Sequence, residues 1–173
     1  ELFPKFLGKA FPEAKGLFLV PTIDGYLLED GYSALIEQMK IKDIPYMLGS
    51  TADDILVTPE IKQKGEHGPV YDGCLSFCRK VAEAGRQPAW MYEFTRKLPG
   101  DETGAFHSSE LWYMFGTVKR CWRPLEEGDY ALSEQMLDCW TNFMKYGNPN
   151  GKAEGSFKPC RGDEKEVFEF TVR

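Results

Sequence analysis

One histidine and a pair of adjacent carboxylates are the side chains of this sequence whose types and order suit acyl-transfer chemistry. His107 follows Gly104 and comes just before an aromatic run, and Asp53 and Asp54 follow a short apolar segment that ends at Gly49. A carboxylate can hold an imidazole in one tautomer and stabilise it once charged, while the imidazole takes a proton from a nucleophile. The sequence therefore offers two of the three parts of a catalytic triad.

The third part, a nucleophilic serine in its usual setting, does not occur in the sequence. Hydrolases whose triad runs in the order Ser, then Asp or Glu, then His carry the serine in a Gly-x-Ser-x-Gly turn between a strand and a helix. Residues 1–173 contain no such pentapeptide, and no His-Gly-Gly-Gly run that could supply an oxyanion hole. Because both groups carry much of the catalysis, we expect little or no activity from this chain alone.

The same residues have structural explanations, which the residue types alone leave open. A lone histidine beside an aromatic run is more often a packed loop residue than a catalytic one. One aspartate of an adjacent pair can cap the following turn while the other stays in solvent. His67, in a polar segment broken by glycine and proline, is expected to be a solvated loop residue.

The pattern of apolar residues predicts the elements that must position these groups. We expect helices over residues 31–40, 73–84 and 130–146, a short helix after His107, strands over Ile44–Leu48, Ala89–Phe94 and Val167–Val172, and a surface loop over residues 59–70. The first helix is expected to be capped by Asp30, the short helix by Ser108 or Ser109, and the last helix by Asp129. The short helix is expected to pack on the core through its apolar side chains, which are Leu111, Tyr113, Met114 and Phe115.

This alternation of helices and strands indicates an α/β fold with a mostly parallel sheet flanked by helices. Residues 1–173 contain no convincing linker, repeat or low-complexity tract, so we expect a single piece. The aromatic, irregular residues 1–20 suggest chain that packs on something larger.

Composition narrows the function classes further. The formal net charge is −6, which argues against nucleic acid and against an anionic membrane surface as partners. The five cysteines show neither a disulfide framework nor a complete zinc-ligand spacing, so we interpret them as mainly reduced packing residues. Reduced thiols slightly favour a cytoplasmic location, although the sequence leaves the compartment open.

Four stretches in one order resemble the type B carboxylesterase family, which includes para-nitrobenzyl esterases and cholinesterases. The longest is Gly-Ala-Phe-His-Ser-Ser-Glu-Leu-Trp-Tyr-Met-Phe-Gly over residues 104–116, which is similar to the histidine motif of that family. The others are Pro-Thr-Ile-Asp-Gly at 21–25, Pro-Tyr-Met-Leu-Gly-Ser-Thr-Ala-Asp-Asp at 45–54, and the segment from Trp140 to Gly151. The resemblance covers the chain from about residue 10 to its end.

The resemblance implies the C-terminal part of an α/β-hydrolase fold that lacks the half carrying the nucleophile. It makes His107 the general base and Asp54 the triad acid, where the family more often has Glu, with Asp53 as the less favoured alternative. It implies a small-molecule carboxylic ester as substrate, the missing N-terminal half as partner, and no metal or organic cofactor. Because an Asp side chain is shorter than a Glu side chain, the loop that carries Asp54 must approach His107 more closely.

Two further expectations follow from the resemblance. Strand edges that should pair with the missing half would stay open, so we expect the isolated chain to form homo-oligomers or aggregates. The alternative to an esterase is a non-catalytic, esterase-like binding or adhesion module, because the same fold includes members that have lost the triad. Retention of both His107 and an acid favours the enzyme, and a purely structural domain is the third possibility.

Overall fold

A computed structural model of the protein describes residues 21–172. The chain divides into two compact units, residues 1–38 and residues 39–173, which are described separately. The expectation that residues 1–20 pack on something larger lies outside the described residues.

In the first unit, the described residues form a turn and a short helix. Oδ1 of Asp24 accepts hydrogen bonds from the backbone N–H groups of Tyr26, Leu27 and Leu28, and Gly25 has a φ of +72°, so Asp24 and Gly25 form a turn. Helix α2 spans only Tyr32–Glu37, with Gly31 as its N-cap. The predicted cap is wrong, because the Asp30 carboxylate accepts the N–H of Gly31, outside the helix.

The second unit is built on a parallel sheet. Strands β1 (Tyr46–Thr51), β2 (Ala89–Phe94) and β3 (Phe168–Phe170) pair in the order β1-β2-β3 within the described part of the chain. Both pairings are parallel, which confirms the predicted sheet. β1 begins at Tyr46 rather than Ile44, because the N–H of Tyr46 makes the first bond, to the carbonyl of Pro88, and Pro45 has no N–H to donate.

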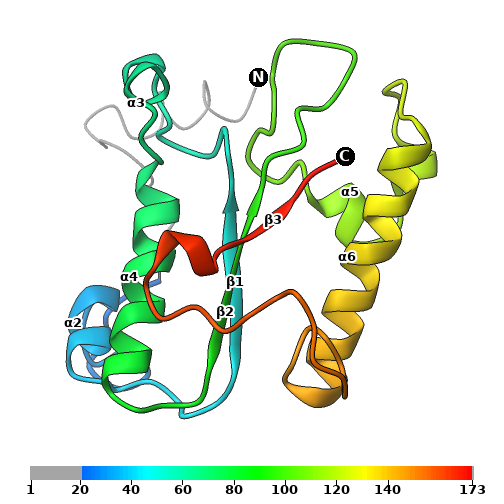
Figure 1. The fold of residues 1–173 in the computed structure, drawn as a ribbon. Coiled ribbons are helices and arrows are strands. Elements are labelled where there is room, and N and C mark those ends of the chain that lie inside the picture. Colours follow the sequence, from blue (N-terminus) through cyan, green and yellow to red (C-terminus); the bar gives the residue numbers. More distant parts are fainter. Residues whose placement is uncertain (1–20, 173) are drawn as a thin grey trace. The chain divides into compact units, whose positions relative to one another are not determined.

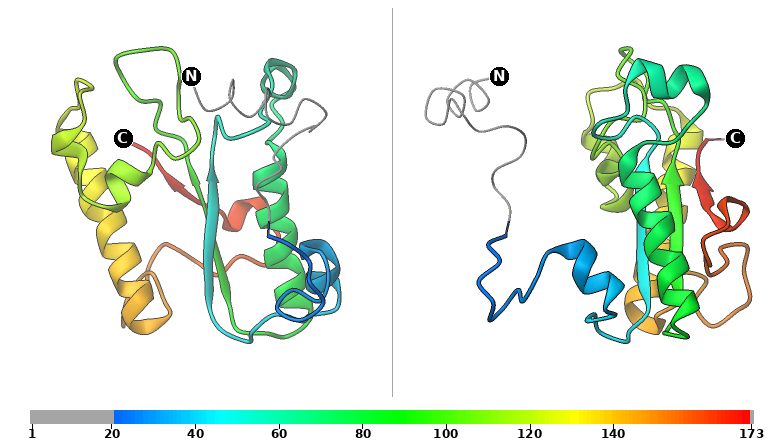
Figure 2. Two further views of the ribbon diagram at one scale, coloured as in Figure 1. Left: turned by 180° about the vertical axis from the view of Figure 1, so that it is seen from behind. Right: turned by 90° about the vertical axis from the view of Figure 1, so that its left-hand side faces the viewer.

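Helix α4 (Pro69–Glu83) covers one face of this sheet, and α5 (Leu111–Met114) and α6 (Glu127–Tyr146) lie on the other face (Figure 1 and Figure 2). The 3-10 turns η1 (Val118–Arg120) and η2 (Glu164–Glu166) precede α6 and β3, respectively. Parallel strands with helices on both faces place the loops after β1 and β2 at one edge of the sheet.

The segment 59–70 is not the loop that its composition suggested. Helix α3 spans Pro59–Lys64 and ends at Gly65, whose φ is +69°, and α4 starts at Pro69 instead of residue 73. Both prolines occupy the first turn of a helix, where the missing N–H has no intrahelical partner to lose. They therefore start helices here rather than interrupt them.

The long helix α6 is present as predicted but starts earlier than residue 130. Its N-cap is Glu126, and Asp129 is the third helical residue, where its carboxylate accepts the N–H of Glu126 at 2.9 Å. The two side chains form a reciprocal capping box, so the prediction of Asp129 as N-cap was wrong by three positions. Gly147 ends the helix with a φ of +66°.

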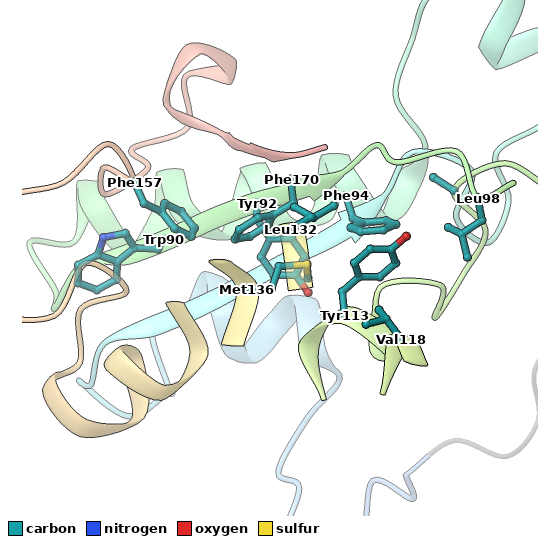
Figure 3. Packing of buried hydrophobic residues seen from close by; sticks show 11 residues of the cluster. Trp90, Tyr92, Phe94, Leu98, Tyr113, Val118, Leu132, Met136, Phe157 and Phe170 are labelled. Atoms are coloured by element: carbon teal, nitrogen blue, oxygen red, sulfur yellow. The ribbon is translucent and has the colours of Figure 1, made fainter. Parts of the chain in front are cut away.

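The core lies between β2, β3 and the two helices that cover them (Figure 3). Successive strand residues point to opposite faces, so Trp90, Tyr92 and Phe94 of β2 all face this side. The ring centroid of Tyr92 is 5.0 Å from that of Trp140 on α6, and the centroid of Phe94 is 5.1 Å from that of Tyr113 on α5. This packing holds α5, and with it the segment of His107, against the carboxyl end of β2. Within residues 21–172, no helix has the length and apolar character needed to cross a bilayer.

Candidate functional site

Loops that follow β1 and β2 meet at the carboxyl edge of the sheet. Past the end of β1, the N–H of Ala52 donates to the carbonyl of Phe94 at 2.9 Å, and the N–H of Asp53 donates to the carbonyl of Ala105 at 2.9 Å. Asp53 also forms an isolated parallel bridge with Phe106. The strand pairing therefore continues for one step into the loops and fixes the two acidic residues beside His107.

The structure brings Asp54 and His107 into direct contact. Oδ1 of Asp54 lies 2.6 Å from Nδ1 of His107, within the range of a strong charge-assisted hydrogen bond. An ionised carboxylate can only accept, so Nδ1 must carry a proton, and in the neutral form of the ring Nε2 then keeps its lone pair. The imidazole side chain is 57% exposed, whereas the carboxylate is 6% exposed. The result is an oriented histidine whose free nitrogen faces away from a buried acid.

The surroundings of Asp54 keep it ionised. Burial alone would raise its pKa, but the backbone N–H groups of Thr51 and Ile55 donate to it at 3.0 and 2.7 Å, and His107 donates as well. Together these hydrogen bonds lower the pKa of Asp54 below its ordinary value. A carboxylate held in this way remains a negative charge beside the imidazole, which is the state that stabilises an imidazolium.

Asp53, the other candidate acid, has a different set of partners. Its Oδ2 accepts the N–H of Ala105 at 2.7 Å, and its Oδ1 forms an ion pair with Lys62 of α3. Gly104, with a φ of +70°, passes so close that a Cβ there would collide with the Asp53 carboxylate. Asp53 therefore ties the loop before His107 to the end of β1. Neither aspartate matches the structural alternative of one capping and one solvated carboxylate.

Glu110 is a site residue that the sequence analysis did not single out. Its Oε2 is buried and has no hydrogen-bond partner among the described residues. Burial raises the pKa of Glu110, the charge of Asp54 raises it further, and His107 opposes that rise. The site thus holds two carboxylates whose pKa values move in opposite directions, a pattern typical of acid–base sites. The position of Glu110, three residues after His107, is the sequence signal that could have indicated this residue.

The turn that carries His107 is not capped as predicted. Helix α5 starts at Leu111 with Glu110 as its N-cap, and no side chain in residues 21–172 caps it. Ser108 has a φ of +70°, and the N–H of Ser109 donates to the carbonyl of Phe106 at 2.9 Å. The serines therefore form the turn itself. Among the residues expected to bury this helix, Tyr113 is fully buried, but Leu111 and Phe115 are exposed.

Arg123 fixes the loop between β2 and His107 through contacts with three of its residues. One guanidinium nitrogen donates to the carbonyl of Pro99 at 2.9 Å, and another reaches the carboxylate of Asp101 at 2.8 Å. The guanidinium carbon also lies 5.4 Å from the ring centroid of Phe106, the residue before His107. Nothing in the sequence pattern marks this arginine, because its partners are distant in the chain.

A second buried network joins the end of β2 to α5 and α6. Arg96 forms a two-point ion pair with Asp129, with contacts of 2.8 and 2.9 Å, and the hydroxyl of Tyr113 donates to the same carboxylate at 2.6 Å. Burial would raise the pKa of Asp129, but Arg96 and the other donors outweigh it and lower the pKa. Tyr113 thereby fixes the helix that follows His107.

His67 is not the solvated loop residue that its composition suggested. Its ring stacks on Tyr71 of α4 with centroids 3.7 Å apart, and its Nδ1 lies 3.1 Å from Oε1 of Glu93 on β2. It is on the face of the sheet covered by α4, so it is separate from the pair formed by Asp54 and His107. Within residues 21–172, no three histidine, cysteine or acidic side chains are grouped as metal ligands.

A parallel sheet between two helical layers, with an Asp–His pair in the loops at its carboxyl edge, defines the α/β-hydrolase class of fold. Solved structures agree. One described as a thermophilic PNB esterase superposes with a TM-score of 0.65 at 20% identity, over 97% of this chain and 43% of that chain. Another, described as a PNB esterase, gives a TM-score of 0.60 at 19% identity, over 90% and 40% of the two chains. At these identities, the likeness establishes the fold.

Family membership follows from the sequence. The model of the carboxylesterase family matches residues 66–173, so this chain belongs to that family. Carboxylesterase 4A from Bos taurus is 24% identical over 99% of this chain and 42% of its own length. Liver carboxylesterase from Sus scrofa is 29% identical over 78% of this chain and 27% of its own length. The chain thus spans less than half the length of these relatives.

Proposed function

We propose that this chain supplies the histidine and the acid of a serine carboxylesterase, with His107 as general base and Asp54 as the triad acid. The observation that carries the proposal is the 2.6 Å contact between Asp54 Oδ1 and His107 Nδ1 at the carboxyl edge of the sheet. The exposed imidazole and the buried, ionised carboxylate have the properties that the two roles require.

The chemistry assigned to these residues is proton transfer. Nε2 of His107 takes the proton of a serine hydroxyl as that oxygen attacks the ester carbonyl, and later gives it to the leaving alcohol. Asp54 stays ionised throughout, fixes the Nδ1–H tautomer and stabilises the imidazolium. The Thr51 and Ile55 N–H groups keep the acid ionised while the ring charges.

The nucleophilic serine and the oxyanion hole lie, on this proposal, in a part of the protein outside residues 1–173. Two observations support it: the chain spans less than half of its relatives, and it carries no Gly-x-Ser-x-Gly turn. The substrate class is a small-molecule carboxylic ester, in keeping with relatives named carboxylesterase, juvenile hormone esterase and cholinesterase. The 173-residue chain by itself should have little or no esterase activity.

The sheet offers a place for the missing half. Among the described strands, β1 and β3 each pair with β2 alone, and β1 with six residues offers a longer free edge for a further strand than β3 with three. We assign that edge to the half of the enzyme that bears the serine. In the isolated chain, the same edge should pair between copies, which sedimentation at micromolar concentration would detect as dimers or larger species.

The test compares the two histidines of the chain in the complete protein. His107→Ala should lower hydrolysis of a p-nitrophenyl ester by about 10⁴-fold or more, because it removes the general base. His67→Ala is the matched control and should change the rate less than tenfold, because His67 contacts Glu93 and Tyr71 instead of Asp54. Far-UV circular dichroism of both variants verifies that they fold.

Equal effects of the two substitutions would contradict the assignment of His107. A complete protein that folds but shows no ester hydrolysis before substitution would instead favour an esterase-like binding or adhesion module. In that case, the contact between Asp54 and His107 would serve only to hold two loops together.

A further inference from the structure

The loop over residues 98–104 leads from β2 toward His107 and is closed at its neck. The N–H of Leu98, which is 2% exposed, donates to the carbonyl of Gly104 at 3.2 Å. The tip of the loop, residues 100–103, is exposed. Only two residues separate Gly104 from His107, so a shift of this loop would be passed on to the imidazole.

One arginine from another part of the chain binds the tip of this loop. Arg123 lies between η1 and α6, and its side chain is 4% exposed. Its guanidinium donates to the carbonyl of Pro99 at 2.9 Å and to the carboxylate of Asp101 at 2.8 Å. It also donates to the hydroxyl of Thr103 at 3.3 Å. Because a guanidinium carries five N–H donors in a rigid fork, one side chain holds three residues of the loop at once.

Aromatic rings join the same guanidinium to the residue before His107. Its Cζ lies 5.4 Å from the ring centroid of Phe106 and 4.7 Å from that of Trp122, within the range of cation–π attraction. The ring of Phe106 in turn meets that of Trp112 on α5 edge to face, with centroids 6.1 Å apart. Arg123 therefore contacts both the tip of the loop and the residue that precedes the imidazole.

Arg123 has a fixed base and a charged partner. The N–H of Leu125 donates to the carbonyl of Arg123 at 2.8 Å, and the next residue, Glu126, caps α6. Hydrogen bonds from Arg123 and then from Thr103 lower the pKa of Asp101, so this carboxylate is ionised at neutral pH. The guanidinium is thus an anchored donor that faces a negatively charged acceptor.

We propose that Arg123 is a positioning residue for His107, which fixes the loop after β2 so that Nδ1 of the imidazole stays against Asp54. The catalytic part of this proposal rests on the proposed function, because it needs His107 to act as the base. Its structural part does not, because the hydrogen bond between His107 and Asp54 can be observed without substrate. A displacement of about 1 Å at a reacting group can cost about a hundredfold in rate, even when the substituted residue is remote.

The kinetic test uses the complete protein and a p-nitrophenyl ester. Arg123→Ala should lower kcat by about 10–100-fold and change KM by less than about threefold, because it misplaces the base without touching the substrate. Millimolar guanidinium chloride should restore part of the lost kcat, since the ion can take the place of the missing side chain, whereas sodium chloride should not. Arg120→Ala, at an exposed position three residues earlier, is the matched control and should change kcat by less than about twofold.

A spectroscopic test follows the hydrogen bond itself in the complete protein. The proton between Nδ1 of His107 and Asp54 should give a proton NMR signal far downfield of the amide region, and this signal should be lost in His107→Ala. Arg123→Ala should shift or broaden the signal, and guanidinium should restore it. Arg123→Lys keeps the charge but not the fork of donors, so it should have the same effect and serves as the second variant if Arg123→Ala does not fold.

An NMR signal that is unchanged in both Arg123 variants would overturn the proposal, even if kcat falls, because the arginine would then contribute only to stability. An altered signal with unchanged kcat, in a protein that hydrolyses esters, would overturn its catalytic part. If the unsubstituted protein hydrolyses no ester, the proposed function fails, and the signal still decides whether Arg123 positions His107.

Discussion

Asp54 Oδ1 and His107 Nδ1 lie 2.6 Å apart although the two residues are separated by 53 positions in the chain. The contact exists because the backbone of the neighbouring residue, Asp53, pairs with Ala105 and forms a bridge with Phe106. One aspartate thus aligns the two loops through its backbone and the other uses its side chain on the imidazole.

Asp54 and Asp53 should differ in their effect on activity. In the complete protein, Asp54→Asn should lower kcat for a p-nitrophenyl ester by about 10³–10⁴-fold, because an amide does not hold the Nδ1–H tautomer or stabilise the imidazolium. Asp53→Asn should lower it less than about tenfold, because it weakens a partly exposed ion pair with Lys62. Reversed effects would make Asp53 the acid.

Acid should remove a stabilisation that Asp54 provides. Its pKa in the folded chain lies below the ordinary value of about 3.9, so the stabilisation is complete above that pH and is lost as the pH falls through the folded-state pKa. The free energy of unfolding of the unsubstituted chain should therefore exceed that of Asp54→Asn most at neutral pH. Urea unfolding at a series of pH values should show this difference shrinking below about pH 4. A difference that grows on acidification would contradict the lowered pKa.

Gly104 and Gly85 form a matched pair for the loop before His107. Both have positive φ, +70° and +63°, but an added Cβ would meet the Asp53 carboxylate at Gly104 and no atom within 4 Å at Gly85. Gly85→Ala should cost about 1–2 kcal/mol of unfolding free energy through backbone strain. Gly104→Ala should cost about 1–3 kcal/mol more, because it forces Asp53 aside. Equal losses of unfolding free energy for the two variants, measured by urea unfolding, would show that the Asp53 carboxylate can move aside without a cost in stability.

Asp129 should be among the most sensitive polar positions of the fold. Asp129→Ala should lower the free energy of unfolding by about 3–5 kcal/mol, because it leaves the Arg96 guanidinium and the Tyr113 hydroxyl without their shared acceptor. Glu134→Ala, at an exposed position of the same helix, should change it by less than about 0.5 kcal/mol. A loss at Asp129 as small as that at Glu134 would mean that the network contributes little to stability.

The parts of the fold that depend on local pattern could be predicted from the residues. The apolar runs around Met47 and Met91 specified strands, and their separation by a helical segment indicated parallel pairing, as the structure confirms. The stripe from Leu132 to Phe143 specified α6. The order of the acidic pair and His107 also identified which residues could carry the chemistry. These features are properties of short segments, so they can be recognised without knowledge of the rest of the chain.

The partners of those residues depend on how distant segments of the chain pack together. Asp53 and Asp54 are chemically identical neighbours, and only the strand bridge to Phe106 turns one of them to the backbone and the other to the imidazole. His67 was expected in solvent, but α4 folds back and brings it to Glu93. Burial, hydrogen bonding and pKa depend on residues far away in sequence, so no local pattern could specify them.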